Sequence, residues 1–381
     1  MKKQRLTKKL RIVTLWLVSV FWLTACQSDE ETQHDRWDVS VKHALETLIN
    51  EEGGKGAYAV FDFDKTTSVN DVSQALWVYQ IEHLRFADAP THLFLDGITE
   101  PDVVLDGLGL TSTQMGTVLK EEYDQLQALR EAGWSLDEIH ATDVYLDFRA
   151  RMYSFLEGLA DSFPSEVHLA WMPGLLTGYT LDEARAVVAD AIDDQYGEGM
   201  PGYDVWISPD GRWGGNVERG IWISDEMRWL YRRLIDSGIT PYVCSASHEL
   251  IVEVLACDSR RGLGIPAEQV FGLRTLPGAV FNATYDTTYA MPINEGKVRC
   301  INAYMAPAHD GRAPVLVAGD SNGDVPMLTH YNDTRISLII DVKRAADSEI
   351  GRLVNRARSG DSRYKLQPCF VEVPTPSGGG I

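Results

Sequence analysis

The stretch Ala57-Tyr58-Ala59-Val60-Phe61-Asp62-Phe63-Asp64-Lys65-Thr66 decides the fold class of this sequence. Five apolar residues, several of them good β-formers, are followed at once by two carboxylates. A short apolar run of this kind is typical of a buried strand in a parallel sheet. Open α/β sheets bind their ligands at the carboxyl ends of such strands. The stretch therefore predicts an α/β fold with a functional site at Asp62 and Asp64.

Further strands are predicted downstream, at residues 239–244, 314–318 and 336–340. They end in polar residues, namely Ser245, Gly319-Asp320 and Asp341. Because the ends of parallel strands meet at one edge of a sheet, these residues suggest a single shared site. Helices are predicted at residues 37–50, between Ser224 and Gly238, and at residues 250–255, from their apolar spacing and end signals.

The region between the first two strands, residues 69–220, has mainly helical patterns. Leu119, Tyr123 and Leu126 share one helical face, and Thr180 with Glu183 forms a capping box. We interpret this region as a helical insertion, or cap, without a second independent sheet. Residues 37–68 and 221–373 then form the α/β core, and residues 374–381 are expected to be a disordered tail.

The chain has 381 residues and a formal net charge of −20, with 44% apolar residues. The apolar fraction is typical of a chain that buries a core, and the length suits two domains or one domain with a large insertion. The acidity argues against a nucleic-acid partner, because phosphate backbones need a basic protein face.

The N-terminus predicts an exported protein with a lipid anchor. A basic segment precedes the apolar stretch 12–23, which is short for a membrane span, and Leu23-Thr24-Ala25-Cys26 follows. This pattern is typical of a bacterial lipoprotein signal in which Cys26 is lipidated. Residues 1–25 are then the signal peptide and residues 26–36 a tether. Gln27 after the cysteine favours the outer membrane, facing the periplasm; an uncleaved anchor and an ordinary signal peptide are the alternatives.

The other four cysteines, at positions 244, 257, 300 and 369, form no C-x-x-C pair, so a zinc or thioredoxin-type site is not indicated. In an oxidising compartment the sequence permits one or two disulfides without assigning them.

The residues at the predicted strand ends suit phosphoryl chemistry. Paired carboxylates such as Asp62 and Asp64 can hold Mg²⁺ through oxygen, or one can attack phosphorus while the other handles the leaving-group proton. Such pairs also cap turns. The hydroxyl of Ser245 can donate to a phosphoryl oxygen. Ser247 and His248 are rival candidates for that role, and Ser247 is expected to cap the following helix.

Two later segments add a cation and more carboxylates. Lys297 stands at a predicted helix start in Asn294-Glu295-Gly296-Lys297 and could neutralise a nucleophile and a phosphoryl group. Asp320 and Asp324, in Gly319-Asp320-Ser321-Asn322-Gly323-Asp324, could ligate a cation or support Lys297. Taken singly, a surface lysine and an ordinary Gly/Asp turn explain these segments equally well.

The four motifs in this order resemble those of the haloacid dehalogenase superfamily of aspartyl-phosphate phosphatases. The resemblance implies a Rossmann-like core with a mostly parallel sheet and a C1-type helical cap inserted after the first motif. It implies Asp62 as nucleophile, Asp64 as general acid and base, and Ser245, Lys297 and Thr66 on the phosphoryl group. It also implies Mg²⁺ held by Asp62, the Asp64 carbonyl and Asp320, with Asp324 as an additional ligand or a partner of the ligands.

The resemblance also narrows the reaction. Superfamily ATPases have Thr at the position of Asp64 and dehalogenases lack this second Asp, so hydrolysis of a phosphomonoester is favoured over phosphotransfer. The large cap favours a small phosphorylated metabolite as substrate. A non-catalytic lipoprotein that binds a phosphorylated ligand is the competing class, but such proteins often lose a catalytic carboxylate, and Asp62, Asp64, Lys297, Asp320 and Asp324 are all present.

Two branches of the superfamily are similar in detail. Phosphoserine phosphatases usually have Asn where this chain has Gly323, and Ser-Gly where it has Ser245-Ala246. The segment from Asn70-Asp71 to Trp77 resembles the phosphorylcholine phosphatases, so a phosphorylcholine-like substrate is favoured and phosphoserine is the alternative. Aromatic faces bind quaternary ammonium groups, so Trp77 is a candidate substrate contact, with Asp71 as a carboxylate partner. Core packing and helix capping are the alternative roles of these two residues.

Overall fold

The computed structural model describes residues 35–87, 103–169, 174–197, 202–282 and 284–371. The chain divides into two compact units, Met1–Trp37 and Asp38–Ile381, and the structure below is that of the second unit. The predicted signal peptide, the lipidation site Cys26, nearly all of the tether and the predicted tail at residues 374–381 lie outside the described residues.

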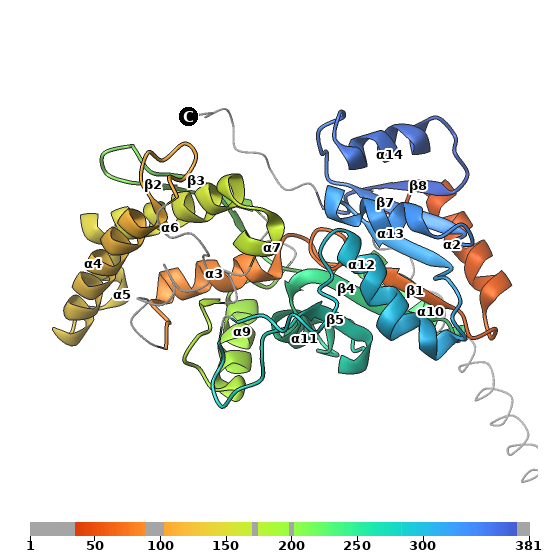
Figure 1. The fold of residues 1–381 in the computed structure, drawn as a ribbon, viewed down its shortest axis with the longest axis horizontal. Coiled ribbons are helices and arrows are strands. Elements are labelled where there is room, and N and C mark those ends of the chain that lie inside the picture. Colours follow the sequence, from red (N-terminus) through yellow and green to blue (C-terminus); the bar gives the residue numbers. More distant parts are fainter. Residues whose placement is uncertain (1–34, 88–102, 170–173, 198–201, 283, 372–381) are drawn as a thin grey trace, which may run out of the picture. The chain divides into compact units, whose positions relative to one another are not determined.

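The second unit is built on a six-stranded sheet with the order β5-β4-β1-β6-β7-β8 (Figure 1). Every neighbouring pair in it is parallel. The strands are β1 (Tyr58–Phe61), β4 (Thr240–His248), β5 (Val270–Leu273), β6 (Leu316–Gly319), β7 (Ile336–Asp341) and β8 (Tyr364–Pro368). This arrangement confirms the predicted α/β core with a parallel sheet.

Strand β1 lies in the middle of the sheet, between β4 and β6. Phe61 is opposite Val243 of β4 and Ala318 of β6, so the residues that follow these three strands meet at one edge. All four residues of β1 are buried. The continuous apolar run thus fills the centre of the sheet and delivers Asp62 to the edge where the other motifs arrive.

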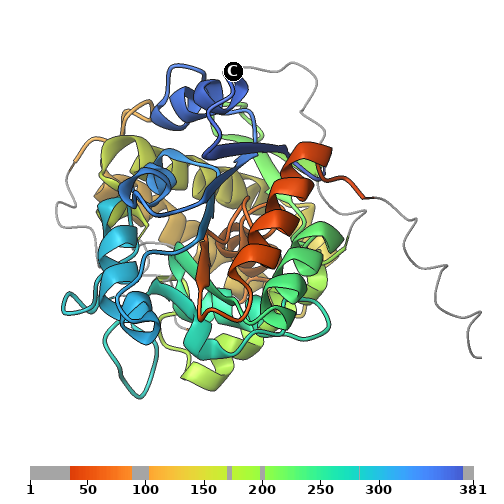
Figure 2. The same cartoon turned by 90° about the vertical axis from the view of Figure 1, so that its right-hand side faces the viewer.

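Helices cover both faces of the sheet. In Figure 2 the red helix α2 (Val39–Glu52) and the green helix α10 (Asp225–Asp236) lie on one side, and the blue helices lie on the other. The Phe61 ring packs on Tyr231 of α10, with ring centroids 4.6 Å apart. Val60 and its neighbours on the opposite face share a buried cluster with α12 (Glu295–Cys300), α13 (Val325–His330) and α14 (Glu349–Arg358). The remaining core elements are α11 (Glu249–Ala256) and the short helical turns η1 (Ala267–Gln269), η2 (Ile301–Met305), η3 (Ala306–His309) and η4 (Asn322–Asp324).

Two strands of the core were not predicted. Strand β5 has four residues, and β8 reads Tyr-Lys-Leu-Gln-Pro, with only two of its five side chains buried. Both are edge strands. Gly272 interrupts the apolar residues of β5, and polar residues interrupt those of β8. Strand β4 also extends past the predicted end at Cys244 as far as His248, with a shift of its register against β5 between those residues.

The insertion contains α3 (Val72–His83), α4 (Ser112–Glu131), α5 (Leu136–His140), α6 (Asp143–Ser162), α7 (Ser165–His168) and α9 (Leu181–Gln195). It also contains an antiparallel hairpin of β2 (Gly202–Ile207) and β3 (Gly214–Arg219), so the prediction of an insertion without a sheet is incomplete. The hairpin strands are polar, with only Trp206 and Val217 buried, and their alternation is too weak to be read from the sequence.

Trp206 anchors the hairpin to the helices of the insertion. Its ring lies 5.4 Å from that of Trp77 in α3, which in turn lies 6.4 Å from Tyr153 in α6. Trp77 is completely buried in this cluster. The insertion therefore has a hydrophobic core of its own, separate from the two faces of the sheet.

The two connections between the core and the insertion lie side by side. The Val69 N–H donates to the Trp222 carbonyl at 2.7 Å, and the Asn70 side chain donates to the carbonyls of Arg219 and Gly220 at 2.9 and 3.1 Å. None of the helices in the described part of the chain combines the length and apolar character that a membrane span requires.

Candidate active site

Asp62 leaves the sheet in a tight turn. Its N–H donates to the Ala318 carbonyl of β6, and its own carbonyl accepts from the Thr67 hydroxyl. The Phe63 carbonyl then accepts from the N–H groups of Thr66, Thr67 and Ser68. This turn holds the Asp62 side chain at the sheet edge, where it is 7% exposed.

Lys297 is buried between two carboxylates. Its Nζ lies 2.5 Å from Asp62 Oδ1 and 2.6 Å from Asp324 Oδ1, and the residue is only 2% exposed. The preceding Gly296 allows α12 to begin close to the chain before it, since a Cβ there would lie 1.9 Å from the Met291 carbonyl oxygen. The predicted meeting of the first and third motifs is thus present in the structure.

Asp324 fixes the loop that follows β6. Its Oδ2 accepts hydrogen bonds from the N–H groups of Asp320 and Ser321 and from the Ser321 hydroxyl, each at 3.0 Å. Gly319 makes room for this carboxylate, because a Cβ at that position would lie 2.4 Å from the Asp324 Cβ. Both oxygens of Asp324 are therefore occupied, one by Lys297 and one by the loop.

Asp320 is held by two different groups. Its Oδ2 accepts from Arg344 Nη2 at 2.7 Å, and its Oδ1 accepts from the Thr66 hydroxyl at 3.2 Å. The same hydroxyl lies 3.5 Å from Asp62 Oδ2. Thr66, predicted to bind phosphate, here links two carboxylates. Arg344 was not predicted, because it follows β7 in a segment with no recognisable motif.

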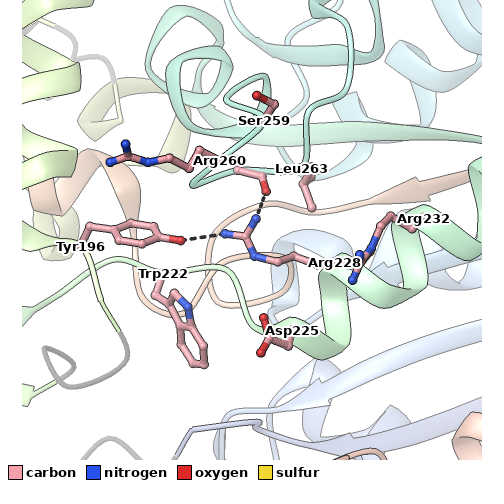
Figure 3. A pocket seen from close by; sticks show the side chains of 9 residues that line it. Tyr196, Trp222, Asp225, Arg228, Arg232, Ser259, Arg260 and Leu263 are labelled. Atoms are coloured by element: carbon pink, nitrogen blue, oxygen red, sulfur yellow. Dashed lines mark hydrogen bonds between the residues drawn. The ribbon is translucent and has the colours of Figure 1, made fainter. Parts of the chain in front are cut away.

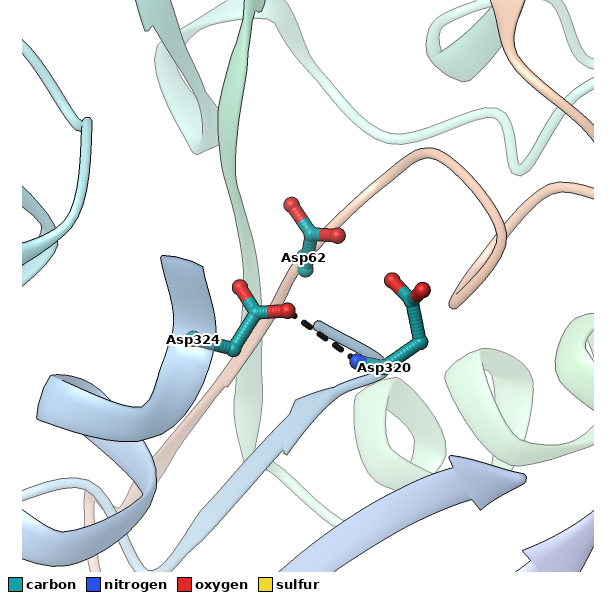
Figure 4. Close-up of side chains that lie close together, drawn as sticks. All are labelled: Asp62, Asp320 and Asp324. Atoms are coloured by element: carbon teal, nitrogen blue, oxygen red, sulfur yellow. Dashed lines mark hydrogen bonds between the residues drawn. The ribbon is translucent and has the colours of Figure 1, made fainter. Parts of the chain in front are cut away.

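The carboxylates fit a divalent cation. Asp62, Asp320 and Asp324 each offer an oxygen, and these oxygens lie within 4.8 Å of one another (Figure 4). Hard cations such as Mg²⁺ prefer carboxylate ligands. Asp62 Oδ2 and Asp320 Oδ1 are bound by neither Lys297 nor Arg344, whereas Asp324 is occupied by Lys297 on one oxygen and by the loop on the other. Asp62 and Asp320 are therefore the better ligands, and Asp324 is the partner of Lys297.

Burial disfavours the ionised form of the carboxyl groups in this site. Burial and the Asp324 carboxylate raise the pKa of Asp62 to about 8, although Lys297 acts in the opposite direction. A cation bound beside Asp62 favours its ionised form, which is the form that can act as a nucleophile. The geometry therefore couples the charge state of Asp62 to whatever cation the site holds.

Each carboxylate oxygen of Asp64 accepts one hydrogen bond. Its Oδ1 accepts from the Val72 N–H at 2.8 Å, and its Oδ2 accepts from the Ser247 hydroxyl at 2.7 Å. Burial, followed by the neighbouring carboxylate of Asp71, raises the pKa of Asp64 well above its usual value. A carboxyl group whose pKa is raised holds its proton to higher pH, which is what a general acid requires.

The residues at the end of β4 have roles that differ in part from those predicted. Ser245 is completely buried, and its Oγ accepts from the Ser247 N–H at 3.1 Å. Ser247 was predicted to cap α11, and this prediction was wrong. The cap is His248, whose Nδ1 accepts from the Leu250 N–H at 3.2 Å, because the strand continues as far as this residue. Ser247 is thereby free to contact Asp64.

The two substrate candidates in the insertion have structural partners. The Asp71 carboxylate caps α3, since it accepts from the N–H groups of Ser73 and Gln74 at 2.8 and 3.0 Å. Trp77 is buried against Trp206 and Tyr153, which is the packing alternative. A contact of either residue with substrate stays a prediction.

A cavity of about 650 Å³ opens beside the motif residues. It lies between the turn after β1, the hairpin and the loop after β7, and Thr66, Glu218 and Arg344 are among its lining residues. Lys65 Nζ spans it to Glu218 Oε1 at 2.8 Å. Because Thr66 and Arg344 both contact Asp320, this cavity reaches the predicted cation ligands from the insertion side.

A second pocket, of about 430 Å³, is lined by none of the motif residues (Figure 3). Arg228 at its centre donates to the Tyr196 hydroxyl at 2.7 Å, to the Ile223 carbonyl at 3.2 Å and to the carbonyls of Arg261 and Gly262. These bonds explain Arg228 as a brace between α10 and the chain after α11. The four cysteines in the described residues, Cys244, Cys257, Cys300 and Cys369, are free thiols.

Comparison with known proteins adds to this picture. No family model matches the chain. It is 26% identical over 245 residues to phosphorylcholine phosphatase of Pseudomonas aeruginosa, which covers 64% of this chain and 56% of that protein. The chain thus spans only a little over half of the length of this relative. The crystal structure of a conserved protein of unknown function from Anaerococcus prevotii has a TM-score of 0.76 and 27% identity, over 86% of this chain and 92% of that one.

The structure brings the predicted motifs together. Asp62, Lys297 and Asp320 lie at one edge of the parallel sheet, where the order of the motifs along the sequence predicts them.

The cap of α11 makes stability depend on pH. Burial lowers the pKa of His248 to about 3, and the cations of Arg185 and Arg274 contribute, while the Phe281 ring packs on the imidazole. The unfolded chain, with a His pKa of about 6.5, binds more protons between pH 6.5 and 3, so the free energy of unfolding falls as the pH falls through this window. The contribution of His248 approaches about 1.4 kcal/mol per pH unit.

The variant His248→Asn retains a capping side chain without the titration. We expect its free energy of unfolding, measured by urea denaturation, to vary less steeply between pH 6.5 and 4 than that of the wild type. Equal slopes for the two proteins would contradict the assignment of His248 as a buried neutral cap.

Proposed function

We propose that the protein is a Mg²⁺-dependent phosphomonoester hydrolase that acts through a phospho-aspartate at Asp62. The observation that carries the proposal is the position of Lys297 Nζ, at 2.5 Å from Asp62 and 2.6 Å from Asp324, with Asp320 on the other side of the nucleophile. This arrangement supplies a carboxylate nucleophile, a buried cation and free carboxylate oxygens for a metal.

The residues divide the reaction into two steps. An oxygen of Asp62 attacks phosphorus while the ester oxygen departs with a proton from Asp64. Asp64 then takes a proton from the water that cleaves the acyl phosphate and regenerates Asp62. Lys297 and Ser245 offset the charge on the phosphoryl oxygens. Bound at Asp62 and Asp320, Mg²⁺ would supply further neutralisation of that charge.

The substrate we propose is a small phosphorylated metabolite of the phosphorylcholine type. The similarity to phosphorylcholine phosphatase supports this choice, as do the departures from phosphoserine phosphatases at Ala246 and Gly323. Tyr203 and Glu218 of the insertion line the cavity of about 650 Å³. A bounded cavity of this size suits a small molecule.

Removal of the metal or of the nucleophile tests the activity. We expect the purified protein to hydrolyse p-nitrophenyl phosphate with Mg²⁺, to lose this activity in EDTA and to regain it when Mg²⁺ is added. Asp62→Asn removes the attacking oxygen charge and should abolish turnover, whereas the matched exposed change Asp333→Asn should leave it unaltered. Full activity in Asp62→Asn would rule out the phospho-aspartate route.

A substrate panel tests the specificity. We expect kcat/KM to be highest for phosphorylcholine among phosphorylcholine, phosphoethanolamine, phosphoserine and glycerol phosphate. The reason is the similarity to phosphorylcholine phosphatase, together with the ability of aromatic and acidic groups to bind quaternary ammonium. A clear preference for phosphoserine would reverse the order of the two substrates.

We also propose that the protein is held in the cell envelope by a lipid on Cys26, at the outer membrane facing the periplasm. The support is the sequence Leu23-Thr24-Ala25-Cys26-Gln27 after a basic and then an apolar segment. In cell fractionation, we expect Cys26→Ala to move the protein out of the membrane fraction. Retention of this variant in the membrane would argue against the anchor.

A further inference from the structure

We propose that Ser247 and Ser73 are positioning residues that hold the carboxyl group of Asp64 for proton transfer to the leaving oxygen. The inference rests on the proposed phosphatase function and deepens it. The sequence offered Ser247 only as a rival phosphate contact and as a helix cap, it did not single out Ser73, and neither serine was predicted to contact Asp64.

The contacts form a continuous chain. The Ser73 hydroxyl donates to Ser247 Oγ at 2.9 Å, and the Ser247 hydroxyl donates to Asp64 Oδ2 at 2.7 Å. The other oxygen of Asp64 accepts from the Val72 N–H at 2.8 Å. Each oxygen of the carboxyl group is thus bound by one donor, one from the start of α3 and one from the end of β4.

The two donors determine which oxygen carries the proton. A backbone N–H can only donate, so Asp64 Oδ1 has to accept and is the carbonyl oxygen of the protonated acid. The transferable proton therefore belongs to Oδ2, which Ser247 contacts. A hydroxyl group can rotate and accept as well as donate, so the Ser247 contact persists whether Asp64 is an acid or a carboxylate.

The contact strengthens as the reaction proceeds. In the first step the bond from Asp62 oxygen to phosphorus forms, the bond from phosphorus to the ester oxygen breaks, and the proton of Asp64 passes to that oxygen. Asp64 becomes a carboxylate, and a hydrogen bond to a charged acceptor is roughly twice as strong as a neutral one. Ser247 thus stabilises the transition state more than the ground state.

The chain of serines also gives Asp71 a function. Its carboxylate accepts from the Ser73 and Gln74 N–H groups and so fixes the first turn of α3. That turn carries both the Val72 N–H and the Ser73 hydroxyl. Because α3 belongs to the insertion and β4 to the core, the two elements together determine the orientation of the general acid.

Leaving-group dependence tests the proposal. The alkoxide of phosphorylcholine needs a proton as it leaves, whereas p-nitrophenolate is stable without one. We measure kcat/KM, because it reports the steps up to phosphoryl transfer and excludes hydrolysis of the phosphoenzyme. For Ser247→Ala we expect a loss of about tenfold or more on phosphorylcholine, or on the best alkyl ester of the panel, and less than about threefold on p-nitrophenyl phosphate.

Two further variants complete the test. Ser247→Thr keeps the hydroxyl and should restore kcat/KM on the alkyl ester to within about threefold of the wild type. Ser73→Ala should show the same substrate pattern with a smaller loss, and it carries the test if Ser247→Ala does not fold. Thr66→Ala is the control: the Thr66 hydroxyl donates to Asp62 and Asp320, so its loss should lower kcat/KM for both substrates alike.

Equal losses on the two esters in Ser247→Ala, or no loss on either, would overturn the proposal. A wild-type protein that hydrolyses neither ester would instead refute the proposed phosphatase function.

Discussion

The buried ammonium group of Lys297 is the interaction on which the rest of the site depends. Asp62, Asp320 and Asp324 lie together at the edge of the sheet with little access to water. Buried charges of one sign are costly unless they are paired. Burial opposes the charge on Lys297, but the carboxylates of Asp324 and Asp62 raise its pKa, so it stays protonated. Lys297, which we propose to offset phosphoryl charge in the reaction, is thus also the side chain that allows the carboxylates to stay together.

Much of the fold follows from local sequence, because the central strands are long apolar runs. Strands β1, β6 and β7 are fully buried and mostly apolar, and the sequence predicts them. The edge strands β5 and β8 and the hairpin bury only part of their side chains, so their patterns resemble loops. The sequence also predicts the motif carboxylates and Lys297, since their order along the chain is characteristic. Asp62 and Lys297 are 235 residues apart in the sequence, and the parallel sheet brings them into contact.

The contacts that the sequence does not predict join segments without a motif. Arg344 reaches Asp320 from the loop after β7, and nothing in its neighbourhood distinguishes it from other surface arginines. Ser247 was expected to cap a helix because a serine before a helix often does so. Strand β4 runs four residues beyond its predicted end at Cys244, so His248 takes the capping position and Ser247 contacts Asp64. Small differences in where an element ends thus decide which polar side chains reach the site.

Asn70 has a position that links these parts. It adopts a left-handed backbone conformation, with φ of 62°, and its carbonyl accepts from the Lys65 N–H in the turn that carries the first motif. Its side-chain amide holds the outgoing carbonyls of Arg219 and Gly220. Both places where the polypeptide crosses between core and insertion are therefore tied to one residue. Through Asn70, a displacement of the chain at Arg219 and Gly220 would act directly on the turn that begins at Asp62.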